Sequence, residues 1–185
     1  MHPAKYFWGL RGLLYKSFLK HVGNLTYIGR PTFIEGRKGI SIGSRTRIFP
    51  AIRMEAIGTG EISIGNNVAI EQNVHITSGG GTLIIGNDVT IAANTCITNI
   101  DHDYRVITSS VMNQDLIFSD TTIGDGTFIG FGAVIQAGTS IGKHCVIGSN
   151  AVVRGIFPDG SVIVGAPGKI VKRYNPETRT WEREI

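Results

Sequence analysis

The sequence lacks three features, each of which would define a class of protein. It has two cysteines in 185 residues, too few for a disulfide framework. It has no apolar run long enough to span a bilayer. Its net charge is only +4, and no stripe of basic and aromatic residues runs along it, which argues against a nucleic-acid partner. The length suits a single domain.

What the sequence does contain is a repeat of six residues, each unit opened by an aliphatic residue. Fifteen of the eighteen openers are isoleucine. A period of six fits neither the 3.6-residue turn of a helix nor the alternation of a hairpin sheet. It is typical of a β-solenoid, in which each unit forms one short strand and a corner. The openers are Val22, Ile28, Ile34, Ile42, Ile48, Met54, Ile64, Ile70, Ile76, Ile85, Ile91, Ile97, Ile123, Ile129, Ile135, Ile141, Ile147 and Val153.

The units fall into groups of three, and the opener of every group's first unit is followed by glycine. Each change of length follows the third unit of a group, where the chain inserts 2, 4, 3, 20 and 0 residues in turn. We therefore predict a triangular prism of six coils over residues 22–157, with all insertions at one edge. At a coil spacing of about 4.8 Å, the column is on the order of 29 Å tall. The 25 glycines suit corners with a left-handed backbone.

The two cysteines fall on different coils of this prism. Cys96 lies on coil four and Cys145 on coil six. Two coil spacings make roughly 9.6 Å, beyond the Cα separation of about 7 Å that a disulfide can bridge. Free thiols fit a reducing cytoplasm.

The first twenty residues follow a different pattern. Phe7, Leu10, Leu14 and Phe18 recur at near-helical spacing, and basic residues separate them. We predict an amphipathic helix within residues 1–21. It is not a signal peptide, because charges interrupt the apolar run and no small-residue cleavage site follows. It caps the open strand edges of the first coil, lies on an anionic membrane surface, or does both.

His102 closes the third unit of coil four, next to the only long insertion, residues 103–122. A neutral imidazole is the usual side chain that accepts a proton near neutral pH. His102 is therefore the candidate general base. No histidine pair with the close spacing of a zinc site is present, so we expect no metal.

Three segments carry a family resemblance. They read IGDGTFIGFGAVIQAGTSIGKHCVIGSNAVV in the repeats, IAANTCITNIDHDYRV before the long insertion, and VGAPGKIVKR after the coils. Together they resemble the hexapeptide-repeat acyltransferases, in the branch of the galactoside and maltose O-acetyltransferases. The resemblance implies an all-β fold, a left-handed parallel β-helix over residues 22–173, followed by a tail at 174–185. Asp101 and Asp103 flank the histidine where galactoside and maltose enzymes have Gly-His-Pro, which is closer to the polysaccharide-modifying members.

The resemblance also implies the roles of further residues. Acetyl-CoA would lie between two subunits of a homotrimer, and transfer would be direct, without an acyl-enzyme. The amide of Phe131 would stabilise the oxyanion. Asn94 would help to set the active site, although Asn73 and Asn150 share its register and a left-handed corner explains all three. The remaining donor contacts would come from Ser149 and Arg154, at the pantetheine and phosphates, and from Lys169 and Lys172, at the 3′-phosphate.

Several alternatives stay open from the sequence. Asp101 or Asp103 would orient the imidazole or simply be solvated, and both, with Tyr104, are candidates for binding the acceptor. The acids would also suit a cationic amine, so an N-acetyltransferase of an amino sugar, sugar nucleotide or amino acid is the first alternative. A non-enzymatic scaffold is the second. The hypothesis favoured by the residues is a cytoplasmic O-acetyltransferase of a sugar hydroxyl in bacterial surface polysaccharide synthesis, in peripheral contact with the inner membrane.

Overall fold

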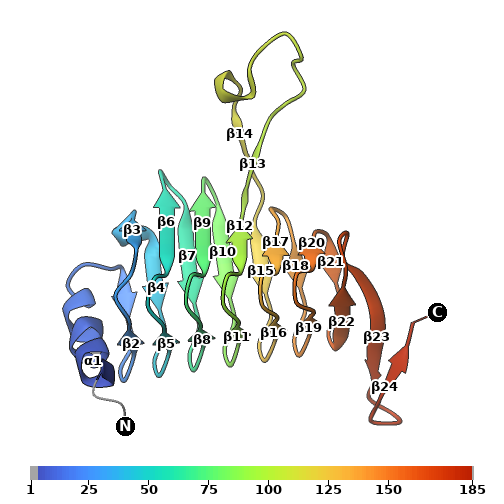
Figure 1. The fold of residues 1–185 in the computed structure, drawn as a ribbon, viewed down its shortest axis with the longest axis horizontal. Coiled ribbons are helices and arrows are strands. Elements are labelled where there is room, and N and C mark those ends of the chain that lie inside the picture. The colour runs from blue at the N-terminus through green and yellow to red at the C-terminus, as the bar shows by residue number, and fades with distance from the viewer. Residues whose placement is uncertain (1–3, 185) are drawn as a thin grey trace.

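The computed structural model describes residues 4–184, and nearly all of them form one column of stacked coils (Figure 1). Three parallel sheets make its three faces, which we call A, B and C. Because consecutive strands of the coils lie on successive faces, a strand inside a face pairs with the strands one coil before and one coil after it. The result is the predicted left-handed parallel β-helix.

The faces have the following strands. Face A consists of β1 (His21–Val22), β4 (Ile40–Ile42), β7 (Glu61–Ile64), β10 (Thr82–Ile85), β15 (Thr121–Ile123), β18 (Ser140–Ile141) and β21 (Ile156–Phe157). Face B consists of β2 (Tyr27–Ile28), β5 (Arg47–Ile48), β8 (Ala69–Ile70), β11 (Thr90–Ile91), β16 (Phe128–Ile129), β19 (Val146–Ile147) and β22 (Ser161–Val164), extended by β23 (Lys169–Asn175) and β24 (Thr180–Arg183). Face C consists of β3 (Phe33–Glu35), β6 (Arg53–Ile57), β9 (His75–Gly79), β12 (Cys96–Thr98), β17 (Val134–Ile135) and β20 (Val152–Val153).

The predicted phase of the repeat is confirmed residue by residue. On face A, Ile42 aligns with Ile64, and Ile85 with Ile123 across the long insertion. These openers point inward and are almost fully buried, forming ladders that fill the column. Each buried isoleucine contributes roughly 1.5–3 kcal/mol of apolar transfer free energy. The insertions lie at the edge between faces C and A, as predicted.

Two features extend beyond the predicted column. A seventh, incomplete coil follows the six predicted ones, because β21 and β22 continue faces A and B. Within the predicted C-terminal tail, β23 ends at Asn175 and β24 spans Thr180–Arg183, and these two strands make an antiparallel hairpin at the end of face B.

The N-terminal helix α1 spans Ala4–Tyr15 and covers the first coil (Figure 1). Arg11 donates a hydrogen bond of 2.9 Å to the carbonyl oxygen of Ile28 on β2, the first strand of face B. Trp8 packs edge-on against Phe49, with ring centroids 5.4 Å apart. The helix therefore packs against the first coil, where the sequence predicts a cap. Among the described residues, no helix is long and apolar enough to cross a membrane.

Candidate active site

His102 stands at the end of β13 (Ile100–His102), which pairs antiparallel with β14 (Leu116–Phe118). This hairpin occupies the 20-residue insertion and projects away from the column between coils four and five (Figure 1). The short 3₁₀ helix η2 (Val111–Asn113) lies in its tip, and η1 (Arg37–Gly39) lies at the same edge of the first coil. The His102 side chain is exposed and makes no hydrogen bond with any described residue. Neither ring nitrogen is therefore occupied by a partner from the described part of the chain.

The base of the hairpin is held by Asn99, a residue that the sequence analysis missed. Its side chain is fully buried, and its Oδ1 accepts a 2.8 Å hydrogen bond from the amide of Gly79. Its carbonyl oxygen accepts a 2.9 Å bond from the amide of Ser119. The Phe118 ring packs over Gly80, where a Cβ would lie only 2.3 Å from it. These contacts anchor the strands that carry His102.

The two acids beside His102 are engaged elsewhere. The Asp101 carboxylate accepts a 2.5 Å hydrogen bond from the Arg154 guanidinium. Asp103 pairs with Arg105 through both of its oxygens, and this pairing, together with the Arg105 amide, holds the pKa of the Asp103 carboxyl well below its usual range. Neither acid contacts the imidazole in this chain.

A second set of predicted residues follows the edge between faces B and C, which we call the B–C edge. Asn94 is on coil four, Phe131 on coil five and Ser149 on coil six, and Lys169 begins β23 beside the same edge. From coil four to coil seven this row extends about 14 Å. The Phe131 amide donates to no acceptor among the described residues, and its side chain is 48% exposed. The amide is thus an available donor.

Asn94 has a structural reason to be where it is. Its φ is +61°, in the left-handed region, and the equivalent corners have Ala51, Asn73, Gly132 and Asn150 at +64°, +58°, +68° and +56°. Glycine and asparagine adopt this conformation with little strain. The corner alone accounts for the asparagine, and its catalytic role stays a prediction.

Lys169 and Lys172 lie on one side of β23 despite their odd spacing. In a regular strand, residues three apart point to opposite faces. Here a register shift leaves Val171 unpaired, so that Lys169 pairs with Val164 and Lys172 with Val162, two residues apart on β22. Both lysines are exposed. They form a small basic site on the outside of face B.

Face C separates the two sets of residues within one chain. Asn94 precedes β12, whereas His102 lies beyond its far end, so the chain crosses the whole face between them. About five extended residues make this crossing roughly 16 Å wide. Arg154, which follows β20, lies on the His102 side, across face C from Ser149. The chain alone does not bring its predicted base to its predicted oxyanion donor.

Sequence analysis also missed a polar cluster on face C. Glu55 is only 8% exposed. It pairs with Arg53 and lies 3.1 Å from Nε2 of His75, and the Thr77 hydroxyl lies 2.8 Å from the same nitrogen. Arg53, with a smaller contribution from His75, lowers the pKa of the Glu55 carboxyl. The residues align only once strands 20 residues apart are paired, so no local motif reveals them.

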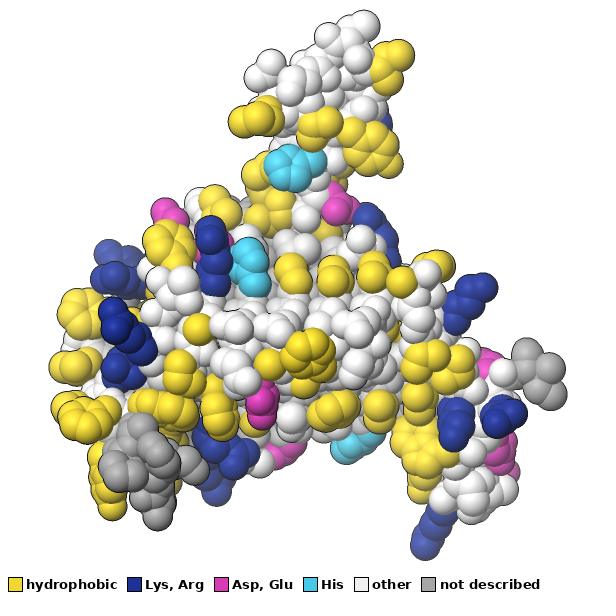
Figure 2. Space-filling model, in the orientation of Figure 1, with side chains coloured by type: hydrophobic (Ala, Val, Ile, Leu, Met, Phe, Trp, Pro, Cys, Tyr) yellow, Lys and Arg dark blue, Asp and Glu magenta, His cyan; other side chains and the backbone are white. Residues whose placement is uncertain are grey.

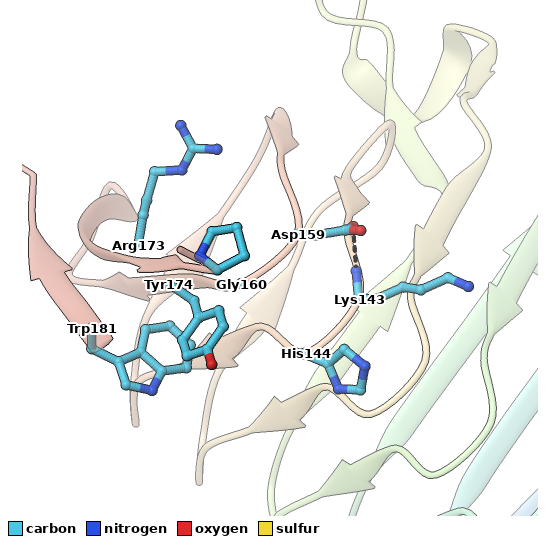
Figure 3. A pocket seen from close by; sticks show the side chains of 8 residues that line it. Lys143, His144, Asp159, Gly160, Arg173, Tyr174 and Trp181 are labelled. Carbon is cyan, nitrogen blue, oxygen red and sulfur yellow. Dashed lines mark hydrogen bonds between the residues drawn. The ribbon is translucent and has the colours of Figure 1, made fainter. Parts of the chain in front are cut away.

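The remaining chemically reactive groups point to no second reaction centre. Cys96 and Cys145 are free, and burial raises the pKa of both thiols. Within residues 4–184, no group of three or more His, Cys, Asp or Glu side chains is arranged to hold a metal ion. A pocket of about 530 Å³ lies at the C-terminal end of the column, between Lys143, His144 and the aromatic pair Tyr174 and Trp181 (Figure 3). It lies at the edge between faces A and B, away from the His102 hairpin.

Known proteins share both this fold and its repeats. The family described as bacterial transferase hexapeptide (six repeats) matches residues 120–155. Over 175 residues the chain is 32% identical to WbbJ of Escherichia coli (strain K12), whose name describes a lipopolysaccharide biosynthesis O-acetyl transferase; the match covers 86% of this chain and 85% of WbbJ. It is 31% identical over 171 residues to the galactoside O-acetyltransferase of the same strain, covering 92% of this chain and 72% of that enzyme.

Among solved structures, AntD, an N-acyltransferase from Bacillus cereus in complex with dTDP and 3-hydroxybutyryl-CoA, has the same fold. The TM-score is 0.75 at 18% identity, over 91% of this chain and 90% of that one. The fold and the repeats define a β-helical transferase. Together with the identity to full-length relatives, they show that the chain belongs to the hexapeptide-repeat acyltransferases, in the branch of galactoside O-acetyltransferase, and that it is an acetyltransferase.

Proposed function

We propose that the protein transfers an acetyl group from acetyl-CoA to a hydroxyl group of a sugar during synthesis of a bacterial surface polysaccharide. The observation that carries the proposal is the exposed His102 on the hairpin that projects from the column, where its imidazole has no hydrogen-bond partner among residues 4–184. The O-acetyl transferases WbbJ and galactoside O-acetyltransferase, which this chain matches over most of its length, support it. The reaction would take place on the cytoplasmic side.

The chemistry follows from two groups of the protein. A ring nitrogen of His102 takes the proton from the acceptor hydroxyl while the oxygen attacks the thioester carbonyl carbon. The amide of Phe131 stabilises the resulting oxyanion, an effect typically worth about 3–4 kcal/mol. The tetrahedral intermediate then collapses, the C–S bond breaks, and the imidazolium returns its proton to the coenzyme A thiolate. The acetyl ester and free coenzyme A leave, and no acyl-enzyme forms.

We further propose that the active site lies between subunits of a homotrimer. His102 and the B–C edge lie on opposite sides of face C, so a second copy is needed to bring one subunit's base to the other's donor site. The exposed Phe128 and Phe131 on and beside face B give that copy an apolar surface to cover. Coenzyme A would lie along the B–C edge, past Ser149 to the lysines of β23.

An oxygen acceptor is favoured over an amine by the local charges. An amine-binding site would present free carboxylates to a cation, but Asp101 and Asp103 are each paired with an arginine. A screen of sugar hydroxyls and amines with acetyl-CoA, in which release of the free thiol is measured, tests whether the acceptor is an oxygen or a nitrogen. Faster turnover of amines than of any sugar hydroxyl would contradict the proposal in favour of the N-acetyltransferase.

The first prediction concerns the base. His102→Ala should lower acetyl transfer by at least ~100-fold, the usual scale for a lost general base, while circular dichroism and sedimentation stay unchanged. His144→Ala, on coil six at the edge between faces A and B, is the matched control and should retain activity. A folded His102→Ala protein that turns over normally would remove this residue from the mechanism.

A further inference from the structure

The N-terminal segment presents a row of large apolar side chains to solvent. Six of them, 55–72% exposed, make what we call the outer face of α1: Tyr6, Phe7, Leu10, Leu13, Leu14 and Phe18. They lie three or four residues apart in two adjoining rows, so that they share one side of the helix and the turn after it. A contiguous exposed surface of this kind usually marks a binding site.

The outer face cannot turn inward, because the opposite side of the helix is already fixed to the column. Gly12 lies so close to β2 that a Cβ there would be 2.3 Å from the carbonyl oxygen of Thr26. Arg11 is bonded to the Ile28 carbonyl on the same side. The helix therefore holds its apolar residues outward as a rigid surface.

The charge of the chain is concentrated at this end. Residues 1–47 contain nine Lys and Arg and one acidic residue, a net charge of +8, whereas residues 48–185 contain nine basic and thirteen acidic residues, a net charge of −4. In Figure 2, Lys and Arg side chains surround hydrophobic ones at the end of the column where Figure 1 places α1. Exposed Arg30, Lys38 and Arg45 make no side-chain hydrogen bond or ion pair with the described residues.

We propose that this end of the column binds the surface of an anionic lipid bilayer. The outer face of α1 would enter the boundary between headgroups and acyl chains, and the surrounding cations would meet lipid phosphates. The helix of 12 residues is too short to cross the bilayer, so it lies along it. A second copy is the less suitable occupant, because it would set one strongly basic end against another.

The proposal places the active site close to the membrane. The coil that carries His102 is three coils from the first one, about 14 Å along the column. In the trimer, a point that rests on the proposed function, a threefold axis parallel to the column puts all three helices on one side, where their binding adds up. Acceptor sugars attached to lipid would then be within reach of the hairpin.

The full-length protein tests this with vesicles. We expect it to sediment with vesicles of phosphatidylcholine and phosphatidylglycerol, weakly with phosphatidylcholine alone, and less as salt is raised. Leu10→Gln with Leu14→Gln keeps good helix formers and should weaken binding at least ~10-fold. The control Ile156→Gln, an 84% exposed residue at the far end of the column, should bind like the wild type.

The charge is tested in the same way. Lys38→Gln with Arg45→Gln should weaken binding to the anionic vesicles and reduce its salt dependence. Arg179→Gln with Arg183→Gln removes two charges from the C-terminal hairpin and should have no effect. Equal binding to neutral vesicles, no binding by the wild type, or unchanged binding by the leucine variant would each overturn the proposal.

Two further measurements, the oligomeric state and acetyl transfer, distinguish membrane binding from contact with a second copy and from loss of activity. If the leucine variant changes the oligomeric state in sedimentation, the outer face is covered by another copy and the membrane proposal is wrong. Transfer to a soluble sugar acceptor should stay at the wild-type level in all these variants. A leucine variant that no longer binds vesicles but transfers acetyl groups normally supports the membrane site. A wild-type protein that transfers no acetyl group would instead contradict the proposed function, whether or not it binds vesicles.

Discussion

At the scale of single residues, the lysines of β23 give the clearest test of where the acyl donor lies. Lys169→Ala with Lys172→Ala should raise the apparent KM for acetyl-CoA by roughly 10-fold, the scale of one lost charge-assisted hydrogen bond. The effect should be smaller for the analogue without the 3′-phosphate, because its partner is already missing. Equal effects on both donors would mean that the lysines do not contact that phosphate; Lys38→Gln with Arg45→Gln, near the other end of the column, is the control.

Glu55 provides a prediction about pH. Its pKa is lowered from the ordinary value of 4.5, chiefly by Arg53 and also by His75. A carboxylate with a lowered pKa stabilises the folded state above its unfolded pKa, and this stabilisation is lost as the pH falls through the folded one. Glu55→Gln should therefore be less stable than the wild type at neutral pH, and the difference should shrink below about pH 4.

Chemical denaturation over a pH series measures this difference. Glu71→Gln is a matched control, because Glu71 makes no side-chain hydrogen bond or ion pair with the described residues. A Glu55→Gln difference that does not vary with pH would mean that the ion pair contributes nothing to folding.

The residues that sequence could identify are those whose neighbours lie nearby in the chain. His102 is marked by its place at the start of the long insertion, and the left-handed corner at Asn94 by its register. Glu55 and His75 lie 20 residues apart, and Asn99 binds Gly79 across one coil. The common orientation of Lys169 and Lys172 could not be predicted from the sequence for a different reason. Only the bulge in β23 puts both side chains on one side of the strand.

At the scale of elements, we expect that the tip of the hairpin β13–β14 can be deleted without unfolding the column. Its tip, residues 104–114, contains no buried side chain. Replacing it with Asn-Gly, which favours a two-residue turn, retains the 3.0 Å bond from the Asp103 amide to the Asp115 carbonyl. We expect stability within about 1 kcal/mol of the wild type.

The same variant separates acceptor binding from donor binding. The KM for acetyl-CoA should stay within about 2-fold, while kcat/KM for the sugar should fall at least ~10-fold, because pocket contacts set acceptor specificity. Unchanged acceptor kinetics would place the acceptor site outside the hairpin tip. The length of this loop was evident in the sequence, but its paired strands were not, since turn residues typical of a hairpin are absent.

At the scale of the whole molecule, stability comes from the isoleucine ladders. Ile76 is fully buried in coil three, and Ile76→Ala should cost about 2–5 kcal/mol through lost apolar contact and the cavity left behind. Ile156→Ala, at an 84% exposed position, should change stability by no more than about 0.5 kcal/mol. Chemical denaturation of the two variants compares them directly, and similar losses would contradict the predicted inward orientation.

The overall architecture was the part most fully contained in the sequence. Because isoleucine dominates one position of the repeat, the sequence shows which side chains point into the column. Each coil contacts only its neighbouring coils, so the repeat also determines how the coils stack. The ends did not follow the repeat and so were less predictable. The incomplete seventh coil contains Phe157 where the other coils have Val or Ile, and α1 turns a mixed side containing Trp8 and Arg11 to the column.

The order of strands in the three sheets also has a consequence for how the protein is made. Because each strand of the three faces, apart from the C-terminal hairpin, pairs only with the coil before it and the coil after it, every coil can find its template already in place as the chain leaves the ribosome, which releases the N-terminus first. The helix that covers the first coil is synthesised before the strands of the column. The only edge exposed at each stage is the one that the next residues to be translated will cover.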